Sequence, residues 1–460
     1  MIGDKAFYKR VLYIAIPIIV QNGLTNFMSL LDNIMVGRIG TEDMSGVAIV
    51  NQLFFVYYLA VFGAVSGPGI FTAQYVGQKN HEGIRYTVRF KLIIALLISA
   101  IGILLFVFQD TNLILLFLHE RGEGIDAAAT LAAARKYISI ITFGLIPFAL
   151  GQAYSETLRE SGEAVVPMLA GMTGVAFNLL FNYILIFGHF GAPALGVVGA
   201  AIATVTARYV ECFIVIFWTH SHPDKNPFVV GLYKNFRIPP DLTVKIILKG
   251  MPLFYNELLW SSGMTALTQC YSTRGLSVIA AFNISNTITN LFNVFLLSMG
   301  SVVAIMIGQI LGSGDMSKVV ETDNRLIFFS VTMSTVLACI QALAAPLFPL
   351  FYNTSDEIRA LACTFIRVAA FYMPLNAFLN AAYFTIRSGG KTLITFIFDS
   401  AFLWFVCWPV AFVLSRFTAM PIVPLYITVL SLDFIKALIG LFMLKKKIWI
   451  QDLVSSTTLQ

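Results

Sequence analysis

Charged side chains are scarce in this sequence. Asp, Glu, Lys and Arg make up 12% of its 460 residues, and 58% of the residues are hydrophobic, whereas an average soluble domain is about 25% charged. This shortage excludes an ordinary soluble protein. The net charge of +6 needs no nucleic-acid partner, because a basic cytoplasmic face over anionic lipid explains it.

Clusters of histidine and cysteine are lacking as well. All five histidines fall outside the long apolar runs, so any proton-binding side chain within the membrane has to be a carboxylate. All five cysteines fall inside those runs, where cysteine mostly packs as a small apolar side chain. We therefore expect no metal centre, no cofactor and no disulfide.

A nucleotide-binding loop is also missing. The stretch SGGKT at residues 388–392 lacks the first glycine of a phosphate-binding loop, and it follows an apolar run instead of a strand. We therefore expect no nucleotide site.

The apolar residues gather in twelve long runs, and a helix needs roughly 20 such residues to cross a bilayer. The alternating pattern of a membrane β-barrel is not seen. The predicted fold class is all-α, a polytopic membrane protein with twelve transmembrane helices. The runs lie near residues 11–35, 46–76, 87–118, 131–158, 164–189, 195–218, 243–272, 277–311, 320–350, 357–386, 393–415 and 420–444.

Basic residues orient these spans. With both termini in the cytoplasm, the cytoplasmic segments collect most of the 30 Lys and Arg residues, as the positive-inside rule requires. The first run is too long for a signal peptide, and no small-residue cleavage site follows it, so we expect it to be retained. The pattern predicts a multi-pass protein of the plasma (cytoplasmic) membrane, and we expect a monomer.

The chain repeats itself. Identical residues recur at a spacing of 235, and further along LRESGEAV at 158–165 aligns with IRSGGKTL at 386–393. Each copy holds six runs, so the copies form parallel repeats. We expect an N-lobe at 1–218, a polar cytoplasmic linker at 219–242, and a C-lobe at 243–460 with a short cytoplasmic tail. The pairs that align at 235 include Pro17 with Pro252, Gln74 with Gln309, and Gly77 with Gly312.

Amides recur inside the runs. Asn283, Asn286, Asn290 and Asn293 have spacings that place them on one helix face. Because amides facing lipid are costly, this face must meet protein or water. Such asparagines can hold helices together. However, the equivalent second run also carries polar residues, and we expect both sets to line a wet substrate cavity. These residues of the second run are Asn51 and Gln52.

Some charges inside the runs can neutralise each other locally. Arg208 and Glu211 are three residues apart, as are Asp433 and Lys436, so each pair can form on its own helix. We therefore interpret both pairs as structural. Asp399 lies near the cytoplasmic end of its run, and we expect it to reach interfacial water.

Glu257 has no basic residue one helical turn away, and Trp260 accompanies it. A carboxylate beside an aromatic ring suits an organic cation. The alternative is a carboxylate hydrogen-bonded at a helix kink below Pro252.

Asp32 is more isolated. It lies roughly 33 Å beyond Arg10 along a helix, towards the outer end of the first run, where the helix dipole disfavours a carboxylate. No basic residue stands at helical spacing from it. A bound proton or Na⁺ would relieve this cost, so we expect a cation site. The alternative is a buried aspartate of purely structural use.

Several stretches resemble the multidrug and toxic compound extrusion (MATE) family, over nearly the whole chain. They are LLDNIMVGRIGTEDMSGVA, AQYVGQKN, LRESGEAVVPM, FNLLFNYILIFG and GVVGAAIAT. The resemblance implies two six-helix lobes forming a V. It also implies an antiporter that exports amphipathic, often cationic compounds in exchange for Na⁺ or H⁺.

The resemblance also assigns residues. It makes Asp32 the first-span aspartate, Asn178 the fifth-span asparagine of the cation site, and Thr204 a hydroxyl contributor. Two positions depart from the family, because Asn182 and Asn376 stand where many or some members carry an aspartate. A glutamate of one bacterial branch aligns with Trp260, one turn from Glu257, so the resemblance leaves Glu257 for substrate.

These features predict a cation-coupled secondary antiporter for small organic compounds, working by alternating access of the two lobes. A flippase for lipid-linked precursors of a related fold is the first alternative, although its phosphate-bearing substrate would call for a strongly cationic cavity. A membrane-embedded transferase is the second alternative, and it would need clustered aspartates or a His-Asp pair, which the sequence lacks.

Overall fold

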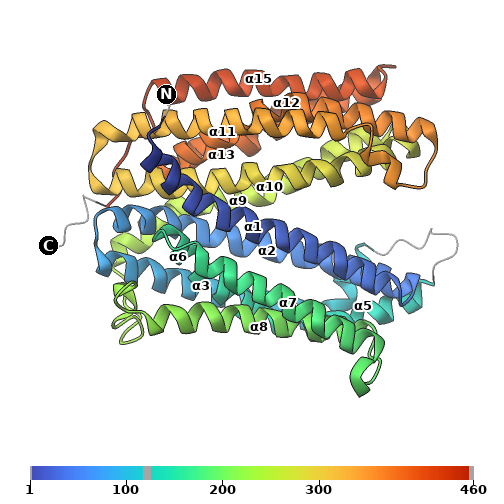
Figure 1. Cartoon of the computed structure of the whole chain (residues 1–460), viewed down its shortest axis with the longest axis horizontal. Helices are drawn as coiled ribbons and strands as arrows, with labels where there is room; N and C mark the ends of the chain where they lie inside the picture. The colour runs from blue at the N-terminus through green and yellow to red at the C-terminus, as the bar shows by residue number, and fades with distance from the viewer. Residues whose placement is uncertain (1–2, 118–125, 455–460) are drawn as a thin grey trace. The chain divides into compact units, whose positions relative to one another are not determined.

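The computed structural model describes residues 3–117 and 126–454. These residues form helices joined by loops and contain no strand (Figure 1), which confirms the predicted all-α class. The helices of the first half are α1 (Lys5–Gly37), α2 (Thr41–Gly77), α3 (His81–Phe108), α4 (Asp110–Leu115), α5 (Ala127–Ile141), α6 (Leu145–Glu160), α7 (Val165–Phe187) and α8 (Val197–Ser221).

The second half continues with longer helices. They are α9 (Pro240–Ser272), α10 (Leu276–Ser313), α11 (Met316–Ala344), α12 (Asp356–Ser388), α13 (Thr392–Phe396), α14 (Trp408–Phe417) and α15 (Ile422–Lys445). In the described part of the chain, eleven helical segments are long and apolar enough to cross a membrane. The expected span outside this set is α9, a helix of 33 residues whose polar residues, such as Asn256, Glu257 and Gln269, make it less apolar.

Two expected spans are not regular α-helices. The fourth is α5 and α6 joined by a 3₁₀ turn at Thr142–Gly144. The eleventh contains two π-helical turns, at Ile397–Ala401 and Leu403–Cys407. Such turns often occur at functional sites, and Asp399 lies in the first of them.

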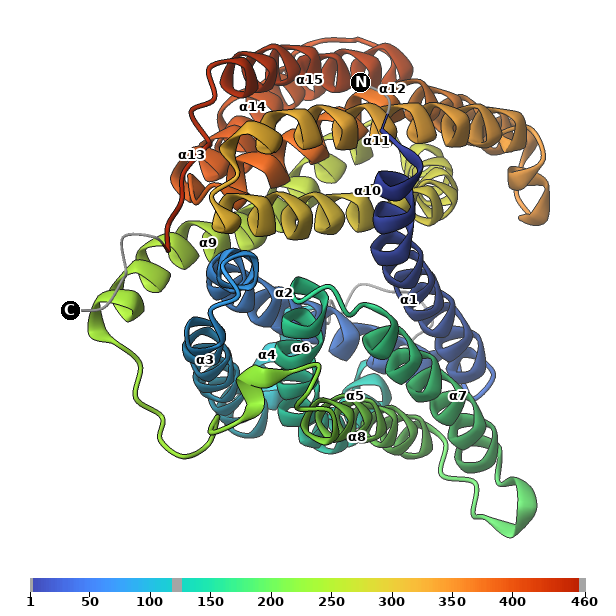
Figure 2. The ribbon, with the colours of Figure 1, turned by 60° about the vertical axis from the view of Figure 1, so that its left-hand side comes forward.

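The chain folds into two compact units. Unit 1 comprises Met1–Ala15, Ala73–Lys79 and Lys245–Gln460, and unit 2 comprises Ile16–Thr72 and Asn80–Val244. Within unit 2, α7 packs along α8, and within unit 1, α10 and α11 pack against α12 (Figure 2). The expected lobe boundaries at 218 and 243 stay a prediction.

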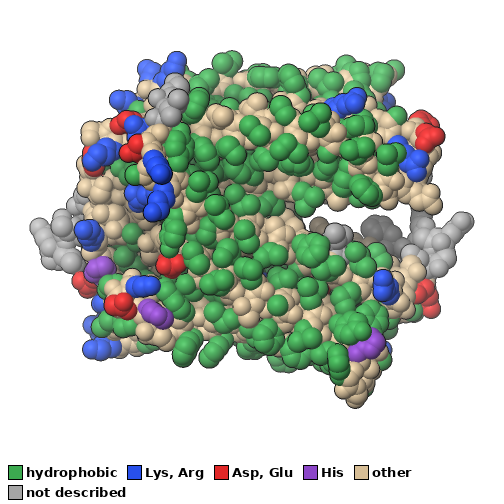
Figure 3. Space-filling model, in the orientation of Figure 1, with side chains coloured by type: hydrophobic (Ala, Val, Ile, Leu, Met, Phe, Trp, Pro, Cys, Tyr) green, Lys and Arg blue, Asp and Glu red, His purple; other side chains and the backbone are tan. Residues whose placement is uncertain are grey.

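Apolar side chains cover the outside of the helices. On the face shown in Figure 3, hydrophobic side chains occupy the middle and charged side chains gather towards the two ends. Phe213 and Phe217 on α8 are 66% and 62% exposed. A surface of this kind suits lipid tails, with polar heads at each end.

The ends of α2 and α10 show the sequence repeat in three dimensions. Both ends belong to unit 1. A Cβ at Gly77 would collide with the carbonyl oxygen of Gln309, and a Cβ at Gly312 would collide with that of Gln74. The two contacts are equivalent under the 235-residue shift, so the paired glycines allow a close and reciprocal crossing of the two backbones.

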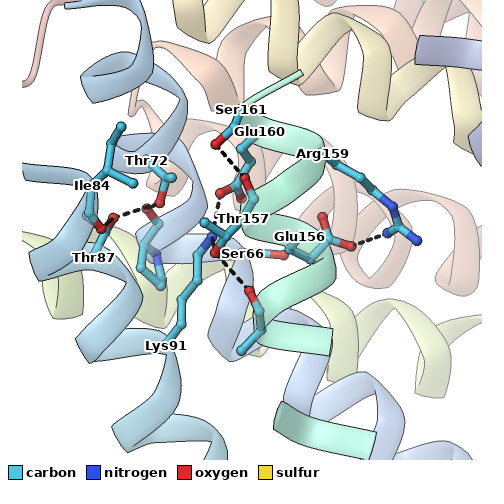
Figure 4. Close-up of polar contacts among 12 residues, drawn as sticks. Ser66, Thr72, Ile84, Thr87, Lys91, Glu156, Thr157, Arg159, Glu160 and Ser161 are labelled. Atoms are coloured by element: carbon cyan, nitrogen blue, oxygen red, sulfur yellow. Dashed lines mark hydrogen bonds and ion pairs between the residues drawn. The ribbon is translucent and has the colours of Figure 1, made fainter. Parts of the chain in front are cut away.

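Unit 2 contains a buried ion pair between α3 and α6 (Figure 4). Lys91 is fully buried and pairs with Glu160, and its Nζ also donates to Thr157 Oγ1 at 3.2 Å. Gly69 on α2 leaves room for the Glu160 carboxylate. The charge of Lys91 is thus neutralised inside the helix bundle.

Beside this pair, α6 also holds α1. Arg159 donates to Glu156 Oε1 at 2.6 Å and to Gln21 Oε1 on α1 at 2.6 Å. Gln21 lies one turn beyond Pro17, which stands just after the point where α1 passes from unit 1 to unit 2. The outer part of α1, which carries Asp32, is thereby fixed to unit 2.

We predict that Gly77→Ala lowers the unfolding temperature in detergent, because the new methyl group meets backbone and not a flexible side chain. The expected loss is about 1–3 kcal/mol, as for overpacked sites. Gly23→Ala on α1 is the control, since nothing lies within 4 Å of its Cβ position, and it should be neutral or stabilising. Equal unfolding temperatures for both variants would contradict the close crossing.

We also predict that Lys91→Met destabilises the protein by about 3–5 kcal/mol, because it leaves the Glu160 carboxylate buried and unpaired. The double variant Lys91→Met/Glu160→Leu should recover much of the loss. Lys318→Met, at a lysine that is 70% exposed, is the matched control and should unfold like the wild type. Thermal unfolding followed by tryptophan fluorescence measures all three.

Candidate functional site

Asp32 of α1 meets α7 inside unit 2. Asn182 Nδ2 donates to Asp32 Oδ1 at 2.5 Å, across 150 residues of sequence. No ion pair within the described residues includes Asp32. The carboxylate therefore has an amide partner and no basic residue bound to it.

The hydrogen bonds continue from Asn182 to α8. Asn182 Nδ2 also donates to Asn178 Oδ1 at 3.0 Å, one helical turn away, and Asn178 Nδ2 donates to Thr204 Oγ1 at 3.2 Å. Asn178 and Asn182 are buried, with 0% and 1% exposure. The structure thus joins the four residues predicted for cation coupling in one series of hydrogen bonds; they are Asp32, Asn182, Asn178 and Thr204.

One side-chain oxygen in this series of hydrogen bonds has no donor among the described residues. Asn182 Oδ1 is buried and has no hydrogen-bond partner within the described residues. A buried carbonyl oxygen without a donor is costly, and a cation with oxygen ligands would relieve that cost. A carbonyl oxygen next to a carboxylate is the type of oxygen ligand that a hard cation takes.

Other polar groups surround the chain. Tyr137 of α5 lies beside Thr204 and within electrostatic range of Asp32. Arg208 Nη1 forms the predicted ion pair with Glu211 Oε2 at 3.1 Å on α8, and its charge also acts on Asp32. The Asp32 site therefore has the phenol of Tyr137 and the guanidinium of Arg208 near it.

Unit 1 holds the second candidate carboxylate. Glu257 on α9 is half-buried and takes part in no ion pair within residues 3–117 and 126–454. Trp260, one turn further, is 41% exposed. Arg387 and Asp399, which carry opposite charges, both lie near Glu257.

Beside Glu257, a polar network crosses the π-helical turn. Asn256 is 1% exposed; its Nδ2 donates to Asp399 Oδ2 at 3.1 Å and to the Tyr383 hydroxyl at 3.2 Å. Lys436 Nζ pairs with Asp399 Oδ1 at 2.7 Å. The expected Lys436 pair with Asp433 is therefore wrong, because Lys436 pairs with Asp399, which α9 and α15 hold in place.

The predicted amide residues lie mostly near the surface of their units. Asn283 and Asn290 are exposed, and Asn286 and Asn293 are half-buried, so the stripe on α10 faces away from the core of unit 1. Asn51 and Gln52 on α2 are exposed, and Asn376 on α12 is half-buried. These positions leave the polar side chains accessible, and their part in substrate binding stays a prediction.

Sequence reasoning missed some buried polar groups. Asp323 of α11 is 3% exposed and accepts a hydrogen bond from Thr385 Oγ1 at 2.5 Å. It stood too close to the start of its run to be counted as intramembrane. His220, which we placed outside the spans, lies in the last turn of α8, where its Nε2 hydrogen-bonds with the Tyr154 hydroxyl at 2.9 Å.

The chain is similar to curated bacterial proteins over most of its length. It is 27% identical over 421 residues to a probable multidrug resistance protein NorM of Thermotoga maritima, covering 89% of this chain and 86% of that protein. It is 26% identical over 409 residues to the multidrug resistance protein NorM of Vibrio cholerae, covering 87% of this chain and 86% of that protein.

Solved structures share the fold. A MATE crystal structure in the bent conformation superposes with a TM-score of 0.85 at 20% identity, covering 99% of this chain and 98% of that chain. An outward-facing multidrug resistance MATE family transporter superposes with a TM-score of 0.83 at 20% identity, with the same coverage.

The MatE family model matches residues 17–184 and 252–413. These two stretches correspond to the two sequence repeats and together make up more than half of the chain. The chain therefore belongs to the MatE family of multi-pass membrane transporters.

Proposed function

We propose that this protein is a secondary antiporter that exports small amphipathic, cationic organic compounds in exchange for Na⁺ or H⁺ bound at Asp32. The relatives compared are named multidrug resistance proteins, which supports multidrug efflux and gives no support to a flippase or a transferase. We place the protein in the plasma membrane, as a monomer with both termini in the cytoplasm, working by alternating access of two lobes at 1–218 and 243–460.

The observation that carries this proposal is the hydrogen-bonded chain at Asp32. Asn182 fixes one carboxylate oxygen at 2.5 Å, while its own amide oxygen is buried without a donor. A carboxylate inside a membrane span is costly unless it binds a cation or a proton. The site therefore favours an occupied state, as a coupling site requires.

Coupling needs one further property. A cation can drive a conformational change only if it binds the two states with different affinity. Asp32 and Asn182 lie on different helices. A shift of α1 against α7 would therefore change the distance between the Asp32 carboxylate and Asn182 Oδ1. Such a shift would alter the cation affinity directly.

The substrate class follows from unit 1. The half-buried carboxylate of Glu257 and the exposed ring of Trp260 stand one turn apart on α9. Charge and cation–π attraction together favour an organic cation with apolar surface. The accessible amides Asn283, Asn286 and Asn290 supply hydrogen bonds without adding charge.

We predict that Asp32→Asn abolishes gradient-driven efflux while the protein stays folded and inserted, because the amide keeps the shape but loses the negative charge that attracts the cation. Efflux from proteoliposomes carrying only a Na⁺ gradient or only a pH gradient measures the effect and identifies the coupling ion. Asp356→Asn is the control, since its side chain is 97% exposed. Full efflux by Asp32→Asn under either gradient would remove Asp32 from the mechanism.

We predict that Glu257→Gln weakens transport of cationic compounds by about tenfold in apparent affinity, the equivalent of roughly 1.4 kcal/mol. Neutral substrates of similar shape should be transported as by the wild type. Glu321→Gln, at a glutamate that is 59% exposed, is the matched control. An equal loss for cationic and neutral substrates would instead indicate the structural role at the Pro252 kink.

A further inference from the structure

Arg208 occupies an unusual position for a residue in a structural ion pair. Its guanidinium lies over the rings of Phe148 and Tyr58, with its Cζ 5.3 and 5.9 Å from the ring centroids. Only its Nη1 bonds to Glu211, and its Nε is buried without a partner among the described residues. The arginine is held in place by α2 and α6, and its Nε is the donor that stays unpaired among the described residues.

The geometry of α8 brings this arginine to the Asp32 site. Arg208 is one helical turn from Thr204, on the same face. Thr204 accepts the hydrogen bond of Asn178 and thus ends the chain that starts at Asp32. The Arg208 charge also lies within electrostatic range of Asp32. The guanidinium therefore pairs directly with Glu211 and stands one helical turn from the hydrogen-bonded series that begins at Asp32.

The charge balance around Arg208 depends on whether a cation is bound at Asp32. With a cation on Asp32, the carboxylate is neutralised, and Arg208 and Glu211 neutralise each other. After the cation leaves, two carboxylates share one guanidinium in a surrounding of low dielectric constant, where an uncompensated charge is costly. Among the described residues, the hydrogen-bonded series at Asp32 is made of uncharged groups; they are Asn182 and Asn178 of α7, Thr204 of α8, and Tyr137 of α5 beside Thr204.

We propose that Arg208 is the internal counter-charge of Asp32, stabilising its carboxylate when no cation is bound and thereby setting how readily the cation is released. Glu211 neutralises part of the Arg208 charge and thereby weakens its effect on the Asp32 carboxylate. Arg208 is a positioning residue that acts through Asp32 and touches neither cation nor substrate. The inference rests on the proposed cation coupling at Asp32 and deepens it.

The pair Arg208 and Glu211 gives a test with opposite signs. In proteoliposomes of the full chain, under the gradient that drives the wild type, we measure the concentration of the driving cation that gives half-maximal efflux. Arg208→Gln should lower this concentration roughly tenfold, because a positive charge that competes with the cation is gone. Its maximal rate should also fall, because release becomes slower.

Glu211→Gln should raise the half-saturating concentration, because the whole arginine charge then acts on Asp32. Arg208→Lys keeps the charge and should stay within about twofold of the wild type, well below the tenfold effect of charge removal. Half-saturating concentrations that are unchanged, or that shift in the same direction for Arg208→Gln and Glu211→Gln, would overturn the proposal.

Folding is checked by thermal unfolding of each variant in detergent. If Arg208→Gln does not fold, Glu211→Gln decides alone, and the absence of a rise overturns the proposal. Different results reject cation coupling at Asp32 and the counter-charge role of Arg208. Full efflux by Asp32→Asn rejects coupling at Asp32, whereas an inactive Asp32→Asn together with unshifted Arg208 and Glu211 variants rejects only the counter-charge.

Discussion

The low dielectric constant inside the membrane is the constraint on which the rest of this structure depends. A charge placed there must be neutralised by a partner, a proton or a bound ion. Lys91 has Glu160, Lys436 has Asp399, and Arg208 has Glu211. Asp32 has an amide partner and no ion pair among the described residues, as Asp323 has a hydroxyl partner and no ion pair. Because Asp32 also adjoins the buried Asn182 oxygen that has no donor, we propose it as the site where a mobile cation completes the charge balance.

The two sequence repeats use the same backbone with different charges. The 235-residue shift places the start of α3 at the start of α11, and the shift of 228 aligns Thr157 with Thr385. In the first repeat, Thr157 meets the ammonium group of Lys91, and in the second, Thr385 meets the carboxylate of Asp323. The threonine is kept and the charge of its neighbour is reversed, so similarity of fold between the repeats does not carry over to their chemistry.

Sequence patterns predicted the bounds of the helices better than the side-chain contacts between helices. The expected runs 164–189 and 195–218 match α7 (Val165–Phe187) and α8 (Val197–Ser221) closely, because length and hydropathy are local properties. The pairing of Lys436 with Asp399 joins two helices across 37 residues. Periodicity shows which residues share a helix face, but it cannot show which helix that face meets. The Asp433 prediction failed for this reason.

The same limit explains what could be predicted of the candidate site. The family resemblance placed Asp32, Asn178, Asn182 and Thr204 together, and the structure joins them by hydrogen bonds. It gave no role to Arg208, because a charge pair on one helix looks self-contained in a sequence. Only the packing of α8 against α2, α6 and α7 shows that the Arg208 guanidinium is held one turn from Thr204, the residue that ends the hydrogen-bonded series of Asp32.

Because position 182 is an asparagine and not an aspartate, the number of negative charges near Arg208 is smaller by one. A second carboxylate there would add a negative charge and strengthen cation binding, whereas the amide leaves one carboxylate near a fixed positive charge. A transporter must release its coupling ion in every cycle, so a site that binds too tightly is as ineffective as one that does not bind. In the proposed site, one carboxylate, the oxygens of Asn182 and Thr204, and a guanidinium one turn beyond Thr204 would let the occupancy change at moderate cost, as a cycle of binding and release requires.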